Sequence, residues 1–212
     1  GGELALSHHD VWTLDSIPRR LAIIGAAATG SQLASIFNAF GAQVHLLELA
    51  PRILPGEDEA VSAALRDSFV ADGIDVRCGV RRVTGLTQLE GGIEIAFEDA
   101  DGAQALGVDA VIASVGWVGN ASTLNLETAG VAQARGSITV NDQLQTSQPH
   151  IFAAGDLTGR VMLVQTAQTD ARVAAENAVR GVGAAASTEI VPHGGFTDPE
   201  YGSVGLTEAD AR

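Results

Sequence analysis

The pattern of apolar and polar positions over residues 21–48 predicts a strand, a turn, a helix and a second strand. Residues 21–24 form an unbroken apolar run, which is typical of a parallel strand buried on both faces. Apolar residues then recur at helical spacing up to Gly41, and a second, mostly apolar run covers residues 44–47. This order predicts a βαβ unit and therefore an α/β fold.

The turn before the helix has the composition of a dinucleotide-binding turn. Gly25 lies where the chain must turn sharply, and Gly30 lies where the helix must pack closely on the strand. Ala27 takes the middle position, where glycine usually lets the backbone approach a pyrophosphate, and the N–H groups of a helix beginning near Thr29 would bind that anion. Glu48 follows Gly30 by 18 residues, near the spacing of the acid that bonds a ribose hydroxyl. The alternative is a βαβ unit whose glycines serve packing alone.

The rest of the chain continues the alternation of strands and helices. The expected elements are a helix over 57–71, alternating strands over 74–98, a buried strand over 110–113, short strands near 138–140, a buried strand over 151–154 and a long helix over 163–179. The strand over 151–154 ends in Gly155 and Asp156, a second glycine turn that carries a carboxylate.

Composition limits the classes of function. The 212 residues carry a formal net charge of −14, which argues against the basic face that nucleic-acid binding needs. No apolar run approaches the length of a transmembrane helix, so no membrane contact is expected and a cytoplasmic location is the default. Cys78 is the single cysteine, which excludes an internal disulfide and a two-cysteine redox centre within these residues. No metal-ligand spacing stands out.

Five segments carry a family resemblance, in the family's order and spacing across nearly the whole chain. They are residues 23–30 (IIGAAATG), 45–59 (HLLELAPRILPGEDE), 114–120 (SVGWVGN), 146–159 (TSQPHIFAAGDLTG) and 196–212 (FTDPEYGSVGLTEADAR). Together they resemble the flavin-dependent pyridine nucleotide-disulfide oxidoreductases, the family that includes dihydrolipoamide dehydrogenase, glutathione reductase and mercuric reductase.

The resemblance implies a domain plan. A connector over 1–18 would precede an NAD(P)-binding domain over 19–118, a Rossmann-like βαβ domain with an added β-meander. The second part of an FAD-binding domain would cover 119–188, and a C-terminal domain through which family members form homodimers would begin over 189–212. The chain lacks an initiator methionine and stops within a helix-like segment, so we expect it to be a piece of a longer protein.

The resemblance also implies a site for the nicotinamide nucleotide. Gly25, Ala27, Ala28, Thr29 and Gly30 would form its pyrophosphate turn. Glu48 would bond the adenine-ribose hydroxyls, which favours NAD over NADP because a carboxylate repels a 2′-phosphate. Arg52 also occurs in the NAD-type pattern and is not interpreted as a phosphate ligand. Gly116 would lie in the loop that borders the nucleotide.

A second set of residues would bind FAD. Gly155 forms the turn, and Asp156 matches the aspartate that accepts a hydrogen bond from the ribityl chain of FAD. The alternative for Asp156 is a helix N-cap. The helix starting near Leu163 and Val164 would direct its N-terminus at the N1/O2 edge of the flavin.

Three departures from the family pattern predict an altered nicotinamide pocket. Ala28 stands where members often carry an aromatic residue that gates the pocket. Gln32 replaces a common glutamate. The loop over 116–120 lacks the two arginines and the proline of the common GRRPN sequence.

The resulting hypotheses are three. The first is an FAD-dependent oxidoreductase that takes hydride from NADH and reduces a disulfide through a cysteine pair outside this chain; no catalytic residue is then expected within it. The second is an NAD(P)H–flavin reductase of quinones or oxygen without a redox disulfide. The third treats the chain by itself as a non-catalytic nucleotide-binding fragment. The substrate would be a small molecule or a disulfide, and the full-length protein a homodimer.

Overall fold

The computed structural model describes residues 2–187 and 190–212, which divide into two compact units. The first unit combines Gly1–Val115 with Gly194–Arg212, and the second is Gly116–His193. The predicted domain boundary at 118/119 stays a prediction, and the one at 188/189 lies outside the described residues.

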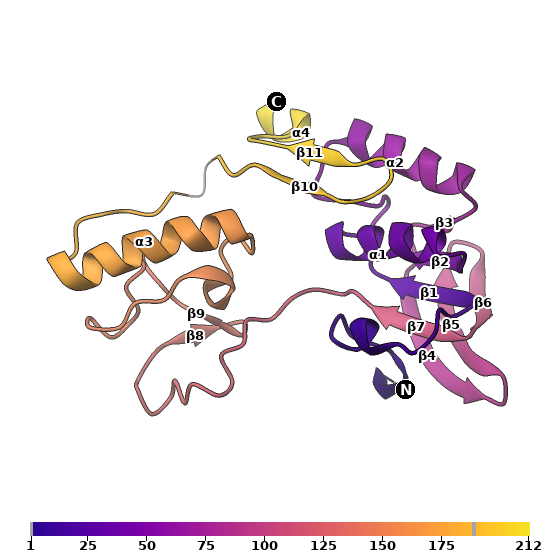
Figure 1. Ribbon diagram of the computed structural model, residues 1–212, viewed down its shortest axis with the longest axis horizontal. Coiled ribbons are helices and arrows are strands. Elements are labelled where there is room, and N and C mark those ends of the chain that lie inside the picture. Colours follow the sequence, from indigo (N-terminus) through magenta and orange to yellow (C-terminus); the bar gives the residue numbers. More distant parts are fainter. Residues whose placement is uncertain (1, 188–189) are drawn as a thin grey trace. The chain divides into compact units, whose positions relative to one another are not determined.

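A four-stranded parallel sheet forms the centre of the first unit, in the order β3-β2-β1-β7. Its strands are β1 (Arg20–Ile24), β2 (Gln43–Leu47), β3 (Asp75–Arg77) and β7 (Ala110–Ala113). The helices α1 (Ala28–Ala39) and α2 (Glu59–Ala71) cover one face of this sheet (Figure 1). Ile24 pairs with both Leu47 and Ala113, so the carboxyl ends of the three strands meet at one edge.

Apolar side chains from both layers form the core between the helices and the sheet. Ile23 and Leu46 point from the sheet toward Phe37 of α1 and Phe69 of α2, and all four are almost completely buried. Burying one such side chain is worth about 2 kcal/mol. The predicted strand–helix–strand unit is therefore present, because its apolar positions match the buried faces.

An antiparallel meander covers the other face of the sheet (Figure 1). It consists of β4 (Arg82–Leu89), β5 (Gly92–Asp99) and β6 (Gly102–Val108). Ile95 and Phe97 of β5 pack beneath the sheet in a second core. The sequence pattern did not predict β6, because its exposed positions are the small residues Ala103, Ala105 and Gly107, which give no polar alternation.

A buried histidine and a carboxylate pair across β2 and β3. His45 Nδ1 lies 2.8 Å from Asp75 Oδ2, and Arg77 Nε donates to the same oxygen at 2.9 Å. The Arg77 guanidinium also lies over the Phe97 ring. Burial raises the pKa of Asp75, but the hydrogen bonds from His45 and Arg77 outweigh it and hold that pKa below the ordinary value of 3.8.

Asp75→Asn is expected to change how the free energy of unfolding falls with pH in the acid range. Because its folded-state pKa is lowered, Asp75 adds stability above its unfolded pKa, and this stability is lost as pH falls through the folded pKa. The variant should lose about 1 kcal/mol at neutral pH and show a shallower decline below about pH 4. Urea denaturation at pH 7 and pH 3 measures both. The exposed Asp15→Asn is the control, and an unchanged decline in the acid range in Asp75→Asn would contradict the assignment.

The C-terminal segment packs against the helices of the first unit. It contains β10 (His193–Gly195), β11 (Tyr201–Ser203) and α4 (Glu208–Ala211). Gln32 Oε1 accepts a hydrogen bond from the Phe196 N–H at 3.0 Å, and Ser35 Oγ accepts one from the Asp198 N–H at 3.0 Å. Both acceptors lie on α1, so the segment is fastened to the helix that follows the glycine turn.

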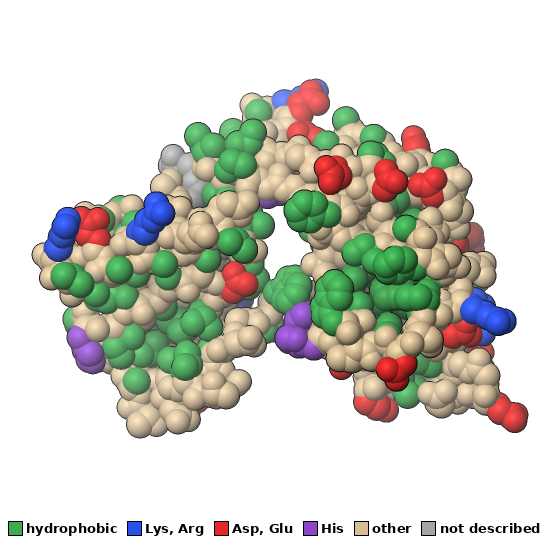
Figure 2. Space-filling view, in the orientation of Figure 1, with side chains coloured by type: hydrophobic (Ala, Val, Ile, Leu, Met, Phe, Trp, Pro, Cys, Tyr) green, Lys and Arg blue, Asp and Glu red, His purple; other side chains and the backbone are tan. Residues whose placement is uncertain are grey.

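The N-terminal residues extend the edge of the sheet. The short helices η1 (Gly2–Leu4) and η2 (Asp10–Thr13) flank Leu6, which bridges Ile112 of β7 in parallel. Figure 2 shows acidic side chains scattered over α2 and the meander, in line with the net charge of −14.

The second unit is built around one long helix. Its elements are β8 (Gln133–Ala134), β9 (Ser137–Ile138), η3 (Gly155–Thr158) and α3 (Val164–Arg180). A small core of Val131, Ile138 and Ala153 lies between them. The predicted strand over 151–154 is wrong, because within the described residues the segment forms only an isolated bridge, between Phe152 and Gln145. An apolar run becomes a strand only where neighbours supply a ladder of hydrogen bonds.

Candidate functional site

The turn after β1 brings two glycines into backbone contact. Gly25 has a φ of +97°, and a Cβ on it would lie 2.2 Å from Ser114 O. A Cβ on Gly30 would lie 1.8 Å from Gly25 O. Neither position accepts a side chain, so the first turn of α1 sits directly against the end of β1.

The N-terminus of α1 is open to an anion. Ala27 is the N-cap, with extended backbone and no side-chain cap, and Ser31 N–H makes the bond back to Ala27 O at 3.0 Å. The N–H groups of Ala28, Thr29 and Gly30 precede the first complete turn and have no carbonyl partner within the helix. Ala27 has a φ of −72°, which any L-residue adopts, so alanine is compatible with this turn.

Glu48 lies beside this turn with its carboxylate held by backbone. Its Oε2 accepts a hydrogen bond from the Ala26 N–H at 2.6 Å, and its Oε1 accepts one from the Ala50 N–H at 2.8 Å. The side chain is half-buried. A carboxylate has about four acceptor positions, so the fixed oxygens retain capacity for ligand hydroxyls.

Arg52 folds the loop that follows Glu48. Its guanidinium donates to the backbone carbonyls of Leu54, Pro55 and Glu57 at 2.7 to 2.9 Å. These bonds use three of the five N–H donors of the guanidinium. The structure thus gives Arg52 a loop-closing role.

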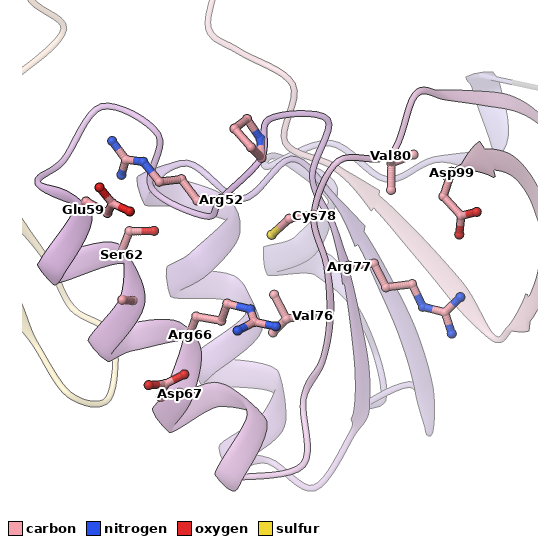
Figure 3. A pocket seen from close by; sticks show the side chains of 12 residues that line it. Arg52, Glu59, Ser62, Arg66, Asp67, Val76, Arg77, Cys78, Val80 and Asp99 are labelled. Atoms are coloured by element: carbon pink, nitrogen blue, oxygen red, sulfur yellow. The ribbon is translucent and has the colours of Figure 1, made fainter. Parts of the chain in front are cut away.

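A cavity of about 550 Å³ lies between α2 and the end of β3 (Figure 3). Its charged lining consists of Arg52, Arg66, Arg77, Glu59, Asp67 and Asp99, so positive and negative charges balance. None of the predicted cofactor residues lines it. Cys78 lies on its wall; burial raises the pKa of the Cys78 thiol, and the positive charge of Arg66 offsets this only in part. A protonated, half-buried thiol favours a role in packing over a redox role for Cys78.

In the second unit, the Gly155 turn and the start of α3 lie side by side. Gly155 has a φ of +75°, and a Cβ on it would approach Ala167 Cβ to 3.4 Å. Thr158 Oγ1 closes the turn by donating to Gly155 O at 2.8 Å. Asp156 is exposed, and its carboxylate makes no hydrogen bond or ion pair within the described part of the chain. It is therefore available to a ligand rather than engaged as a cap.

The N-terminus of α3 has the same open geometry as that of α1. Leu163 is an extended N-cap without a side-chain hydrogen bond, and its carbonyl accepts the Ala167 N–H at 2.9 Å. Val164 begins the helix and is 72% exposed. The first N–H groups of α3 are thus free of intrahelical partners, beside the Gly155 turn.

The predicted residues thus form two groups, one in each unit. The group in the first unit is Gly25, Ala27, Ala28, Thr29, Gly30 and Glu48, and the group in the second is Gly116, Gly155, Asp156, Leu163 and Val164. Gly116 is exposed, with a φ of +124°, at the boundary between the units.

Sequence reasoning did not identify several residues that shape these sites. Ala26 and Ala50 supply the N–H groups that hold Glu48, and no side-chain pattern marks a backbone donor. Gly119 packs on η3, where a Cβ would lie 2.8 Å from Leu157 Cα. The sequence shows a glycine at position 119, but it does not show that this glycine packs on Leu157, 38 residues further along the chain.

A family model described as pyridine nucleotide-disulphide oxidoreductase matches residues 2–171. The chain belongs to this family. Its α/β fold, with the parallel sheet and the antiparallel meander, agrees with that membership. The match and the observed fold confirm the predicted family and fold class. Members of this family are flavin-dependent enzymes that use a pyridine nucleotide.

Curated relatives are similar over nearly the whole chain. A dihydrolipoyl dehydrogenase of Thermus scotoductus is 37% identical over 201 residues, covering 93% of this chain and 43% of the relative. A glutathione reductase of Burkholderia cepacia is 35% identical over 213 residues, covering 100% and 46%. The chain thus spans about half the length of the relatives it matches.

A solved structure supports the same fold. The HOCl-induced flavoprotein disulfide reductase RclA from Escherichia coli matches with a TM-score of 0.88 and 28% identity, covering 99% of this chain and 47% of that one. Within the part of the present chain that the structure describes, no group of three or more His, Cys, Asp or Glu residues could hold a metal ion. No helix in that part has the length and apolar character needed to cross a bilayer.

Proposed function

We propose that the full-length protein containing this chain is an FAD-dependent oxidoreductase that takes hydride from NADH and reduces a disulfide through a cysteine pair outside these residues. One observation carries the proposal: a single chain bears both a nucleotide turn with an anchored acid, Glu48, and a second glycine turn with an available acid, Asp156. Each turn leads to a helix whose first N–H groups are open. Two such sites suit two cofactors.

The second unit would hold part of the FAD. Asp156 would accept a hydrogen bond from a ribityl hydroxyl, and the first N–H groups of α3 would face the flavin ring. Gly155 fits this role because its positive φ lets the chain turn tightly against Ala167. Bound FAD would supply the two-electron chemistry between the nicotinamide and the disulfide. The residues of this chain would position it and favour negative charge near the helix N-terminus.

The first unit would bind NADH in preference to NADPH. Glu48 is anchored with its charge at the site of the ribose, where a 2′-phosphate would meet repulsion. Arg52 directs three of its five N–H donors to the loop, and the neighbouring cavity has no surplus of positive charge. Both observations argue against a phosphate-binding subsite.

Glu48→Ala is expected to reduce the preference for NADH over NADPH by about tenfold, because one unit of repulsion against the phosphate is removed. Glu48→Gln should do nearly the same while keeping the size of the side chain. Dissociation constants for both nucleotides measure the effect, with the exposed Glu90→Gln as the charge control. A wild-type preference for NADPH would overturn this role for Glu48.

The proposal includes a cytoplasmic homodimer that acts on a small-molecule or disulfide substrate. The full-length protein should be titrated without oxygen with one equivalent of NADH, and in parallel with NADPH, while its absorbance is recorded. A long-wavelength thiolate–flavin charge-transfer band would support the disulfide-reductase reaction. Flavin bleaching without that band would favour the alternative, direct reduction of quinones or oxygen. Light scattering would test the dimer.

A further inference from the structure

A buried carboxylate on α3 lacks the hydrogen bonds that burial ordinarily demands. Asp170 is 1% exposed, and neither of its carboxylate oxygens has a hydrogen-bond partner within the described residues. The nearest cation is Arg160, whose Nη1 lies 3.9 Å from Asp170 Oδ2 and also makes no hydrogen bond there. Such a long buried pair is a poor source of stability, because desolvation of both charges offsets their attraction. A role other than stability is therefore expected.

The position of Arg160 indicates that role. Arg160 lies in the short connector between η3 and α3, and 21% of its side chain is exposed. Its Nη2 donates to Ala186 O at 3.4 Å, on the segment that follows α3. One guanidinium thus joins the connector to the second turn of α3 and to the chain beyond that helix.

The two ends of this connector are the flavin-facing elements of the proposed function. Asp156 lies on η3 before it, and the open N-terminus of α3 lies after it. Gly155 also lies near α3, since a Cβ on it would lie 3.4 Å from Ala167 Cβ. Arg160 lies near the start of the connector, and its pairing with Asp170 ties the connector to α3.

We propose that Arg160 and Asp170 are positioning residues that fix Asp156 relative to the N-terminus of α3 and so set the affinity for FAD. This inference rests on the proposed function, because it assumes that FAD binds these two elements. The neighbouring Thr166 belongs to the same buried face of α3, and its hydroxyl also has no partner among the described residues. Asn177, on the same buried face, makes hydrogen bonds with Gln143, Gly183 and Ala184, whereas the Arg160–Asp170 pair is the contact that reaches the connector.

The test compares single and double variants of the full-length protein. Asp170→Asn and Arg160→Met each leave one charge of the pair without its partner, so both should weaken FAD binding at least tenfold and lower the Tm of the apoprotein. The double variant Arg160→Met/Asp170→Leu removes both charges at similar volume and should restore the Tm. If the pair positions the cofactor elements, the double variant will still bind FAD at least tenfold more weakly than wild type.

Three measurements are needed: the FAD dissociation constant after stripping and rebinding, the absorption spectrum of the bound flavin, and the Tm of the apoprotein. The control is Glu176→Gln/Arg180→Met, which removes an exposed ion pair from the same helix and should change none of them. Recovery of FAD affinity together with Tm in the double variant would overturn the positioning role and leave the proposed function intact. A wild-type protein that binds no FAD would overturn the proposed function, and this inference with it.

Discussion

Gly30→Ala is expected to lower the free energy of unfolding of the first unit by about 3 kcal/mol and to abolish NADH binding. The added Cβ would lie 1.8 Å from Gly25 O and 2.9 Å from Gly25 C, so it meets backbone rather than a side chain that can rotate away. Relief requires α1 to move off β1. That movement displaces the N–H groups of Ala28 and Thr29, which the proposed pyrophosphate site needs.

Urea denaturation and titration with NADH measure the two effects separately. Gly56→Ala is the matched control, because its Cβ would meet nothing within 4 Å and its φ is not in the left-handed region. The control should stay within about 0.5 kcal/mol of wild type. Unaltered NADH affinity in a folded Gly30→Ala protein would show that the nucleotide binds away from the N-terminus of α1.

This turn was also the part of the molecule that the sequence predicted best. The apolar run and the helical spacing follow from local periodicity, which the sequence reports directly, and Gly30 packs on Gly25, a residue close in the chain. The structure places Gly25 and Gly30 as expected, and β1, α1 and β2 occupy the expected ranges. The acid at position 48 was predicted too, but its backbone partners were not.

The failures come from features that local pattern does not encode. Residues 151–154 have the composition of a buried strand, yet Phe152 finds only Gln145 as a bridge partner. The sequence also gives no sign that the Asp170 carboxylate is buried without a hydrogen-bond partner among the described residues, because an acid in a helix is ordinarily exposed. Both depend on which distant segments come together.

The C-terminal hairpin of β10 and β11 offers a second prediction, in which an added Cβ meets a side chain rather than backbone. A Cβ on Gly195 would lie 2.2 Å from Tyr201 Cε1 and 2.7 Å from Cζ, so it would clash with the edge of the aromatic ring. The ring packs against the main core of the first unit. Burial, with a smaller contribution from the charge of Glu57, raises the pKa of Tyr201 to about 12, so the phenol is neutral in any measurement near pH 7.

Gly195→Ala and Tyr201→Ala are each expected to cost about 2 kcal/mol of stability, the first by overpacking and the second by lost burial. The double variant should cost about 2 kcal/mol rather than the sum, because truncation of the tyrosine ring leaves room for the new methyl group. The expected coupling energy is therefore about 2 kcal/mol. Urea denaturation of wild type, both single variants and the double variant gives this value.

Gly194→Ala is the control that distinguishes a clash with the tyrosine ring from a clash with the backbone. Its Cβ would lie 2.4 Å from Tyr201 O, a backbone atom that Tyr201→Ala leaves in place. Gly194→Ala should therefore be destabilising with or without the tyrosine ring, and its coupling to position 201 should be near zero. Equal coupling at positions 194 and 195 would mean that the whole hairpin shifts when Tyr201 is truncated, and that Gly195 is not matched to the ring. Coupling confined to position 195 would establish Gly195 and Tyr201 as a complementary pair that fastens the C-terminal segment to the core under α1 and α2.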